Sequence, residues 1–110
     1  MSERDVLDAL RQELRRGTLV LAVLAAFRTE RFGAEGLERL RSAGTDIEPG
    51  ALYPMLRRLE GQGLLTSDRR QEDGRLKRFY RTTSQGQQVL ELLRNEQERL
   101  ARSLRELMGN

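Results

Sequence analysis

The sequence predicts a mainly α-helical fold with one small β-hairpin: a winged helix-turn-helix with an additional N-terminal helix and a long C-terminal helix. Three observations predict it. Apolar residues recur at helical spacing over three successive segments, the last two of them short and joined by a four-residue loop. A basic segment with β-prone ends follows, and a leucine repeat closes the chain. Three helices followed by two strands is the element order of a winged helix-turn-helix.

The first two predicted helices cover residues 3–15 and 19–28. The first is amphipathic, with charged residues opposite four apolar ones: Val6, Leu7, Leu10 and Leu14. Gly17 ends it, and Thr18 is a suitable N-cap for the second helix. The nine apolar residues from Leu19 to Phe27 predict the centre of the core. This run is too short to span a membrane, which takes about 20 residues, so we expect no membrane association.

The next segment predicts the first helix of the helix-turn-helix. A turn is expected at Phe32-Gly33, followed by a short helix over residues 34–42 with Leu37 and Leu40 facing the core. Gly36 lies inside this helix and should weaken it by about 1 kcal/mol relative to alanine.

The recognition helix is predicted over residues 49–62, with Gly63 as the C′ glycine. Its inner face carries Leu52, Leu59 and either Met55 or Leu56. Tyr53 and Arg57 lie one turn apart on the outer face, so both can reach the same stretch of duplex. Arginine suits bidentate hydrogen bonding to guanine or phosphate. The candidate DNA-binding residues of this helix are Pro49, Gly50, Ala51, Tyr53, Pro54, Arg57 and Arg58.

The basic segment, residues 64–82, predicts the wing. Residues 64–67 and 79–82 are β-prone, and residues 71–74 form a turn signal in which Gly74 can take a positive φ. The segment holds six basic and three acidic residues and thus accounts for the net charge of +3 of the whole chain. A basic patch on an otherwise neutral body predicts a polyanionic partner. The candidate DNA-binding residues of the wing are Arg69, Arg70, Arg75, Lys77 and Arg78.

The C-terminal segment predicts a dimerisation helix. Six residues follow one another at intervals of three and four, a heptad seam with one polar member: Leu90, Leu93, Gln97, Leu100, Leu104 and Leu107. We expect this helix to pass beyond the small body and to pair with a second copy, together with the first helix. Residues 1–82 are therefore expected to form the DNA-binding domain and residues 83–110 the dimerisation helix. The candidate dimerisation residues are Leu7, Leu10, Leu14, Leu93, Gln97, Leu100, Leu104 and Leu107.

Four stretches resemble PadR-type transcriptional regulators: residues 14–19, 32–33, 49–60 and 74–83. The pattern Leu52-Tyr53-Pro54 followed by Arg57-Arg58-Leu59-Glu60 is the most specific. The resemblance, to the short subgroup with one C-terminal helix, implies a dimeric repressor with recognition helix 49–62 and wing 69–78.

The same resemblance implies a small hydrophobic effector between the subunits, often stacked on a tryptophan of the last helix. This chain has no tryptophan, and Gln97 stands at that position. Ala34 and Gly36 replace larger residues of the family, which predicts either a looser helix or a small pocket.

The composition argues against enzymatic function. The chain has no His and no Cys, and no pair of carboxylates stands out from ordinary surface charge. We therefore expect no catalytic residue, no metal and no cofactor. The absence of cysteine fits a reducing cytoplasm.

The expected partners are double-stranded DNA with a pseudo-palindromic operator, a second copy of the chain, and a small hydrophobic effector. Two alternatives remain. One is a dimeric module that binds a protein or a ligand, and the other is an architectural DNA binder held by phosphate contacts alone.

Overall fold

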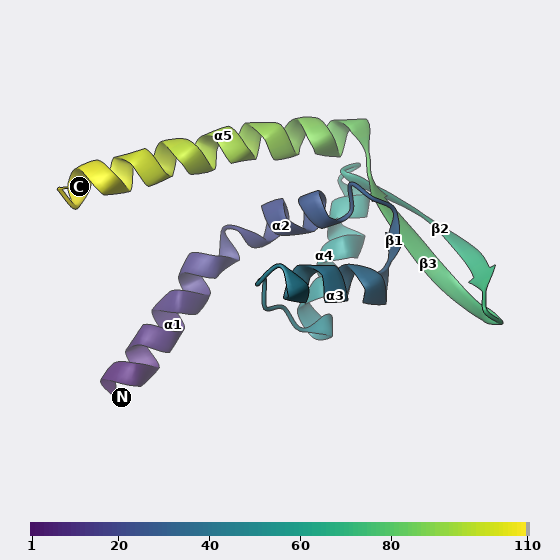
Figure 1. Ribbon diagram of the computed structural model, residues 1–110, viewed down its shortest axis with the longest axis horizontal. Helices are drawn as coiled ribbons and strands as arrows, with labels where there is room; N and C mark the ends of the chain where they lie inside the picture. Colours follow the sequence, from purple (N-terminus) through teal and green to yellow (C-terminus); the bar gives the residue numbers. More distant parts are fainter. Residues whose placement is uncertain (110) are drawn as a thin grey trace.

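The computed structural model describes residues 1–109, which form a helical body with a projecting hairpin and two projecting helices (Figure 1). The elements in order are α1 (Glu3–Arg16), α2 (Leu19–Ala26), β1 (Arg31–Phe32), α3 (Gly33–Ser42), α4 (Pro49–Gly61), β2 (Leu65–Glu72), β3 (Arg75–Thr82) and α5 (Ser84–Leu107). The radius of gyration is 16.3 Å, against about 13 Å for a compact domain of this length. The difference arises because α1 and α5 extend to one side of the body and the hairpin to the other.

The core lies where α2, α3, α4 and the sheet meet. Val23, Leu24 and Phe27 are completely buried, so the predicted position of α2 at the centre of the core is confirmed. Leu37 and Leu40 also face the core, as predicted. From α4 the buried residues are Leu52, Leu56 and Leu59, whereas Met55 is half-buried. Leu56 is therefore the inner residue that the sequence left undecided.

The sheet has three strands in the order β1-β3-β2, not the two that were predicted. The prediction of a turn at Phe32-Gly33 was wrong: Arg31 and Phe32 pair with Tyr80 and Phe79, and α3 begins directly at Gly33. The Phe32 and Phe79 rings meet edge to face with their centroids 5.7 Å apart. This cross-strand contact stabilises β1. A strand of two residues is too short to show an alternating pattern of apolar and polar residues, so the sequence did not predict it.

The hairpin strands are also longer than predicted. They pair continuously from Leu65↔Thr82 to Glu72↔Arg75, leaving a loop of only Asp73 and Gly74. Both loop residues have positive φ, 54° and 74°, the conformation of the tight hairpin turns that match strand twist. The positive φ predicted for Gly74 is confirmed.

Gly36 and Gly86 permit close packing within the body. A Cβ on Gly36 would lie 2.0 Å from Cζ of Phe27, so the phenyl ring occupies the space that a side chain would need. The small pocket that the sequence allowed at Gly36 is therefore filled by Phe27. A Cβ on Gly86, in the first turn of α5, would lie 2.1 Å from the carbonyl oxygen of Leu64.

The helix ends agree only partly with the sequence-based expectations. Gly63 follows α4 with φ +80°, as predicted for a C′ glycine. Thr18 is at the N-cap position of α2, but its hydroxyl donates to the carbonyl of Arg15 (2.9 Å) and caps no amide of α2. Thr83 caps α5, because its hydroxyl accepts from the amide of Gly86 (2.9 Å).

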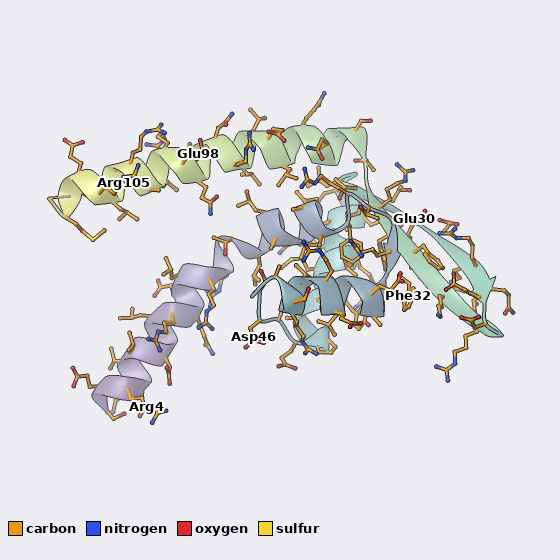
Figure 2. The ribbon with its side chains drawn as sticks, in the orientation of Figure 1. Arg4, Glu30, Phe32, Asp46, Glu98 and Arg105 are labelled. Carbon is orange, nitrogen blue, oxygen red and sulfur yellow. The ribbon has the colours of Figure 1, made fainter. Side chains whose placement is uncertain are left out.

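Apolar residues of the two projecting helices are exposed. No residue of α1 is buried, and Leu14 keeps 74% of its surface accessible. On α5, Leu90 is buried and Leu93 half-buried, but the outer turns expose Leu100, Leu104 and Leu107. Arg4 and Arg105 lie near the far ends of α1 and α5 (Figure 2). Within residues 1–109 no helix combines the length and apolarity needed to cross a bilayer.

Candidate nucleic-acid interface

The outward face of α4 carries the predicted recognition residues. Pro54, Arg57 and Arg58 are exposed, and Tyr53 is half-buried beside them. The Tyr53 ring packs against the start of α3, where a Cβ on Gly33 would lie 2.5 Å from its Cε1 atom. Gly33 therefore leaves room for the edge of the Tyr53 ring at the start of α3, with Arg57 one turn further along α4.

A chain of hydrogen bonds joins the wing to α4. Arg78 donates through Nη1 to the Ser67 hydroxyl (2.9 Å), which in turn donates to the Glu60 carboxylate (2.5 Å). Tyr80 is buried next to this chain; burial raises the pKa of its phenol, and the nearby Glu60 carboxylate raises it further. Because these contacts are partly buried, they fix the angle at which the hairpin leaves the helix.

Sequence reasoning did not assign roles to Ser67 and Glu60. Glu60 is the last residue of the Arg57-Arg58-Leu59-Glu60 pattern, and this position is the sequence feature that could have indicated a role for it. Nothing in the sequence marked Ser67, because its role depends on Arg78, which lies across the hairpin from it.

The basic residues of the wing divide between its two faces. Residues directly opposite each other in an antiparallel pair share a face, and successive residues alternate. The pair Arg69↔Arg78 is therefore on the face of Ser67, toward α4, whereas the pair Arg70↔Lys77 is on the opposite face. The structure thus brings Arg69 and Arg78 to the side of Arg57 and separates Arg70 and Lys77 from it.

The opposite face is occupied by ion pairs and aromatic contacts. Arg70 bonds to Glu30 (2.5 Å), which raises the pKa of its guanidinium, and it lies over the Phe79 ring at 3.9 Å. Lys77 lies 4.1 Å from the centre of the Phe32 ring and 3.5 Å from a carboxylate oxygen of Glu72. Figure 2 shows Glu30 and Phe32 on the side of the body next to the hairpin. The Lys77 side chain is only 22% exposed, so it is less accessible to a phosphate than the sequence suggested.

Four of the predicted cations of the described chain remain exposed without an ionic partner. In the described part of the chain, no carboxylate oxygen lies within 4.0 Å of Arg57, Arg58, Arg69 or Arg75. Arg75 is next to the tip of the hairpin and, paired with Glu72, belongs to the face of Arg70 and Lys77. The side of the molecule formed by α4 and the adjoining wing face thus carries the exposed cations Arg57 and Arg69. Residues 1–109 contain no cluster of acidic side chains placed to hold a metal ion.

The packing of Tyr53 on Gly33 gives a direct test of the interface. We expect Gly33→Ala to displace the Tyr53 ring and weaken DNA binding by about tenfold, since one positioned contact is worth roughly 1–3 kcal/mol. Fluorescence anisotropy with a labelled duplex measures this. Ala34→Gly is the control, because Ala34 is exposed and its change adds no atom beside the ring. Unchanged affinity in Gly33→Ala would exclude Tyr53 from the interface.

A helix-turn-helix followed by a wing defines the class of winged helix-turn-helix proteins. The model of the transcriptional regulator PadR-like family matches residues 20–92. The chain belongs to this family of transcriptional regulators, as the resemblance of its motifs implied.

Individual relatives agree with this membership. The transcriptional regulator Rv3488 of Mycobacterium tuberculosis is 40% identical over 94 residues, which cover 84% of this chain and 88% of that protein. The crystal structure of a PadR family transcriptional regulator from Eggerthella lenta is 36% identical, with a TM-score of 0.91 over 96% of this chain and 94% of that one. A Streptococcus transcriptional regulator is 28% identical, with a TM-score of 0.74 over 88% and 97% of the two chains.

Proposed function

We propose that this regulator is a homodimeric repressor that binds a pseudo-palindromic operator and is released from it by a small hydrophobic effector. In this proposal residues 1–82 bind DNA and residues 83–110 form the dimerisation helix. The observation that carries the proposal is that Arg57 of α4 lies on the same side of the molecule as Arg69 and Arg78 of the wing. The hydrogen-bonded link through Ser67 holds α4 and the wing together.

The wing and α4 have different roles in the proposed complex. Helix α4 enters the major groove, where Arg57 reads base edges, because a helix fits that groove and arginine pairs with guanine in two hydrogen bonds. The wing lies along the backbone, where Arg69 contacts phosphates from the face toward α4 and Arg75 reaches them only from the hairpin tip. Arg78 holds the wing against α4 through Ser67, so it acts as a positioning residue as well as a source of charge.

Dimerisation is proposed from the exposed apolar residues of both projecting helices. On α1 these are Val6, Leu7, Leu10 and Leu14, and on the outer turns of α5 they are Leu100, Leu104 and Leu107. Exposed apolar stripes of this length on a small protein are typical of an interaction surface. A second copy of the chain can bury both apolar stripes at once, because α1 of one subunit and α5 of its partner are both amphipathic. A two-fold dimer presents two recognition helices about 34 Å apart, one turn of DNA.

The effector is proposed to bind next to the interface. A cavity of about 350 Å³ lies between α2 and α5, and its lining includes Thr18, Leu21, Leu90 and Gln97. A cavity of this size accommodates a small organic molecule, and a partner subunit would close its open side. Repression, as opposed to activation, of transcription is proposed from the resemblance to PadR-type regulators.

Two substitutions separate base readout from phosphate contact. We expect Arg57→Ala to relax base preference at one position per half-site by about 1–3 kcal/mol. Arg69→Ala should weaken binding to all duplexes and lower the slope of log affinity against log salt by about one for each phosphate that the variant no longer neutralises. Titrations of specific and scrambled duplexes at several salt concentrations measure both effects.

Lys77→Ala is the matched control for the wing, because Lys77 is on the opposite face and is bound to Glu72. Its salt slope should change less than that of Arg69→Ala. If Arg57→Ala lowers affinity uniformly for all sequences, Arg57 does not read bases.

A further inference from the structure

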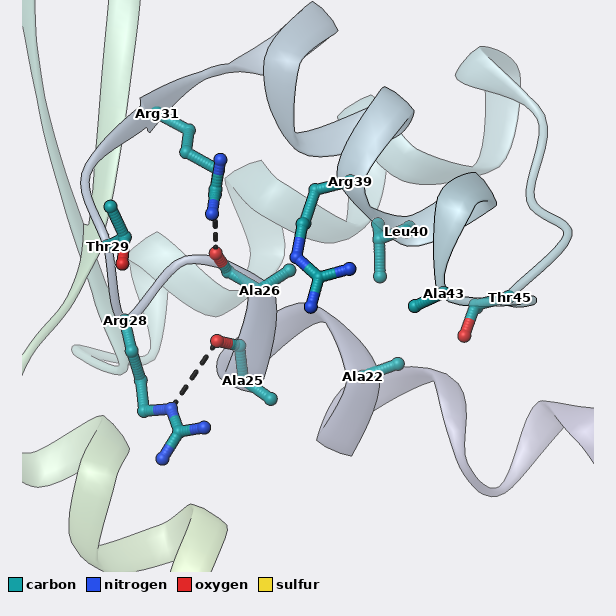
Figure 3. Close-up of a pocket in the computed structure, with 10 residues that line it drawn as sticks. All are labelled: Ala22, Ala25, Ala26, Arg28, Thr29, Arg31, Arg39, Leu40, Ala43 and Thr45. Carbon is teal, nitrogen blue, oxygen red and sulfur yellow. Dashed lines mark hydrogen bonds between the residues drawn. The ribbon is translucent and has the colours of Figure 1, made fainter.

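A small cavity lies at the base of the wing, where the start of α3, strand β3 and Tyr53 of α4 meet. Its volume is about 250 Å³, and its seven lining residues include Gly33, Arg78 and Tyr80. It shares no residue with the cavity between α2 and α5, nor with a larger cavity beside α2 and α3, whose lining residues Figure 3 shows. It is therefore separate from the proposed effector site.

The lining of this cavity is aromatic and basic, and it contains no carboxylate. The rings come from Phe32, Tyr53 and Tyr80, and the cations are Lys77 and Arg78. The volume is below the roughly 300–1,000 Å³ of sites that enclose a drug-sized ligand. The cavity is therefore suited to a small anionic group rather than to a whole organic molecule.

The Tyr80 side chain in this wall is almost completely buried, with 6% of its surface exposed. Its hydroxyl has no hydrogen-bond partner among residues 1–109. No completely enclosed side-chain N or O atom of the described chain lacks a partner, so this hydroxyl reaches open space, and the cavity is the opening that Tyr80 lines. Since buried polar groups are normally hydrogen-bonded, an acceptor from outside the chain would complete the site.

The Tyr80 phenol is available as a donor at neutral pH. Burial raises its pKa, and the nearby Glu60 carboxylate raises it further. The positive charges of Arg78 and Arg57 act in the opposite sense, but the pKa of Tyr80 remains above its ordinary value. The proton therefore stays on the hydroxyl, which can donate it to an oxyanion in the cavity.

Two further groups can donate into the cavity. Arg78 donates through Nη1 to the Ser67 hydroxyl (2.9 Å), and this leaves its Nε and Nη2 groups for another acceptor. Within residues 1–109 no carboxylate oxygen lies within 4.0 Å of Arg78. Gly33 and Ala34 belong to the first turn of α3, a ten-residue helix whose first amides have no acceptor inside the helix.

Two charged groups beside the cavity are engaged elsewhere. The Lys77 ammonium lies over the Phe32 ring and 3.5 Å from a carboxylate oxygen of Glu72. The Glu35 carboxylate accepts from the amide of Phe32 (3.1 Å) and is not part of the lining. We therefore assign the contacts to Tyr80, Arg78 and the first amides of α3.

We propose that this cavity binds one phosphate group of the DNA backbone, which accepts hydrogen bonds from the Tyr80 hydroxyl, the Arg78 guanidinium and the first amides of α3. The inference rests on the DNA binding proposed above and adds to it a built site for one phosphate. Phosphate contacts carry no sequence information but fix the orientation of a protein on the duplex. Since the cavity lies between α3, α4 and the wing, a phosphate held there sets the angle at which α4 enters the groove.

Tyr80→Phe tests the site, because it removes only the hydroxyl and keeps the buried ring. We expect it to weaken binding to the operator obtained by selection about tenfold or more, since a hydrogen bond to a charged group is lost. The Tm should not fall, because the hydroxyl has no partner inside the described chain. Fluorescence anisotropy measures the affinity, and thermal denaturation measures the Tm.

Thr82→Val is the matched control, with the opposite expected pattern. Thr82 is two residues further along β3, and its buried hydroxyl donates to the carbonyl of Leu24 (2.7 Å). This variant should lower the Tm, because a buried acceptor loses its partner, and the folded protein should keep its operator affinity. If Tyr80→Phe lowers the Tm as much as Thr82→Val does, the Tyr80 hydroxyl serves the fold and the proposal is overturned.

Neutral methylphosphonate links, introduced one at a time into the operator, identify the phosphate. At one position per half-site the link should weaken wild-type binding about tenfold, whereas Tyr80→Phe should lose much less further affinity at that position. Arg69→Ala, which removes a different proposed phosphate contact, should keep the wild-type sensitivity there. If the losses caused by Tyr80→Phe and by the link are additive at every position, the hydroxyl contacts no phosphate.

Inorganic phosphate distinguishes a backbone phosphate from a free ion. It is titrated into the ¹⁵N-labelled full-length protein and followed by the amide resonances of Gly33 and Ala34. Its dissociation constant should be no tighter than about 1 mM, because one small ion gains few contacts to offset the cost of binding. Tighter binding would assign the site to the free ion and overturn the proposal.

The outcome for the operator separates this site from the proposed function. If Tyr80→Phe binds the operator with wild-type affinity, the phosphate site is overturned and the proposed DNA binding stands. If the wild-type protein retains no duplex in the selection, both are overturned.

Discussion

Replacing Leu100 and Leu104 with glutamate should convert the proposed dimer into a monomer. Each leucine is about half exposed in the single chain, 49% and 50%, so a partner can cover roughly the other half of its surface. Four such side chains per dimer contribute roughly 3–6 kcal/mol of transfer free energy. A buried, unpaired carboxylate adds a further penalty. Sedimentation equilibrium over a range of protein concentrations measures the change.

The same double variant should bind the operator about 100- to 10,000-fold more weakly, because each half-site then binds without the effective concentration that a linked dimer provides. The control is the pair Asn95→Glu and Arg102→Glu, at exposed positions on the opposite side of α5. The control should remain dimeric. A Leu100→Glu, Leu104→Glu protein that stays dimeric would contradict the assignment of α5 to the interface.

Gly36→Ala should destabilise the protein, although alanine is normally the better residue inside a helix. In an open helical site the change would stabilise by about 0.5–1 kcal/mol. Here the new methyl group meets Phe27 at 2.0 to 2.8 Å, and Phe27 has no exposed surface into which it can move. Overpacking of this kind costs roughly 1–3 kcal/mol or more. A change of 1 kcal/mol in the free energy of unfolding shifts the Tm by about 4–8 °C for a domain of up to about 100 residues. We therefore expect the Tm of Gly36→Ala to be lower by several degrees.

Gly61→Ala is the matched control, because Gly61 is also helical and a methyl group added to it would have no neighbouring atom within 4 Å. This variant should raise the Tm slightly. Both must be compared at one protein concentration, because the stability of a dimer depends on concentration. If Gly36→Ala is as stable as Gly61→Ala, the Phe27 ring does not occupy the position described.

The helices were predictable because their signals are local. Apolar spacing located α1, α3, α4 and α5, and Gly63 marked the end of α4 through the positive φ that its sequence position suggested. Strand β1 was not predictable, since two residues have no period and Phe32 is held by a ring that lies 47 residues further along the chain. The packing at Gly36 was not predictable for the same reason: its neighbour Phe27 comes from another segment of the chain.

The candidate interface was predicted by composition but not in its geometry. The basic residues of the wing were all identified, yet their division between two faces depends on the register of the hairpin. The turn was expected over residues 71–74, and the structure has a loop of Asp73 and Gly74 alone. Because side chains alternate along a strand, moving a strand by one residue would exchange the faces of Arg69 and Arg70. The partnership of Ser67 with Glu60 also depends on this register.

The central claim is sequence-specific DNA binding by a dimer, and the most direct test is selection of duplexes from a random pool by the purified protein at about physiological salt. Phosphate-only binding is weak under that condition. The proposal predicts enrichment of a pseudo-palindrome whose half-sites are about one helical turn apart. Retention of duplexes that share no sequence would instead indicate an architectural binder, and retention of none would favour a protein or ligand interaction module; either result would contradict the claim.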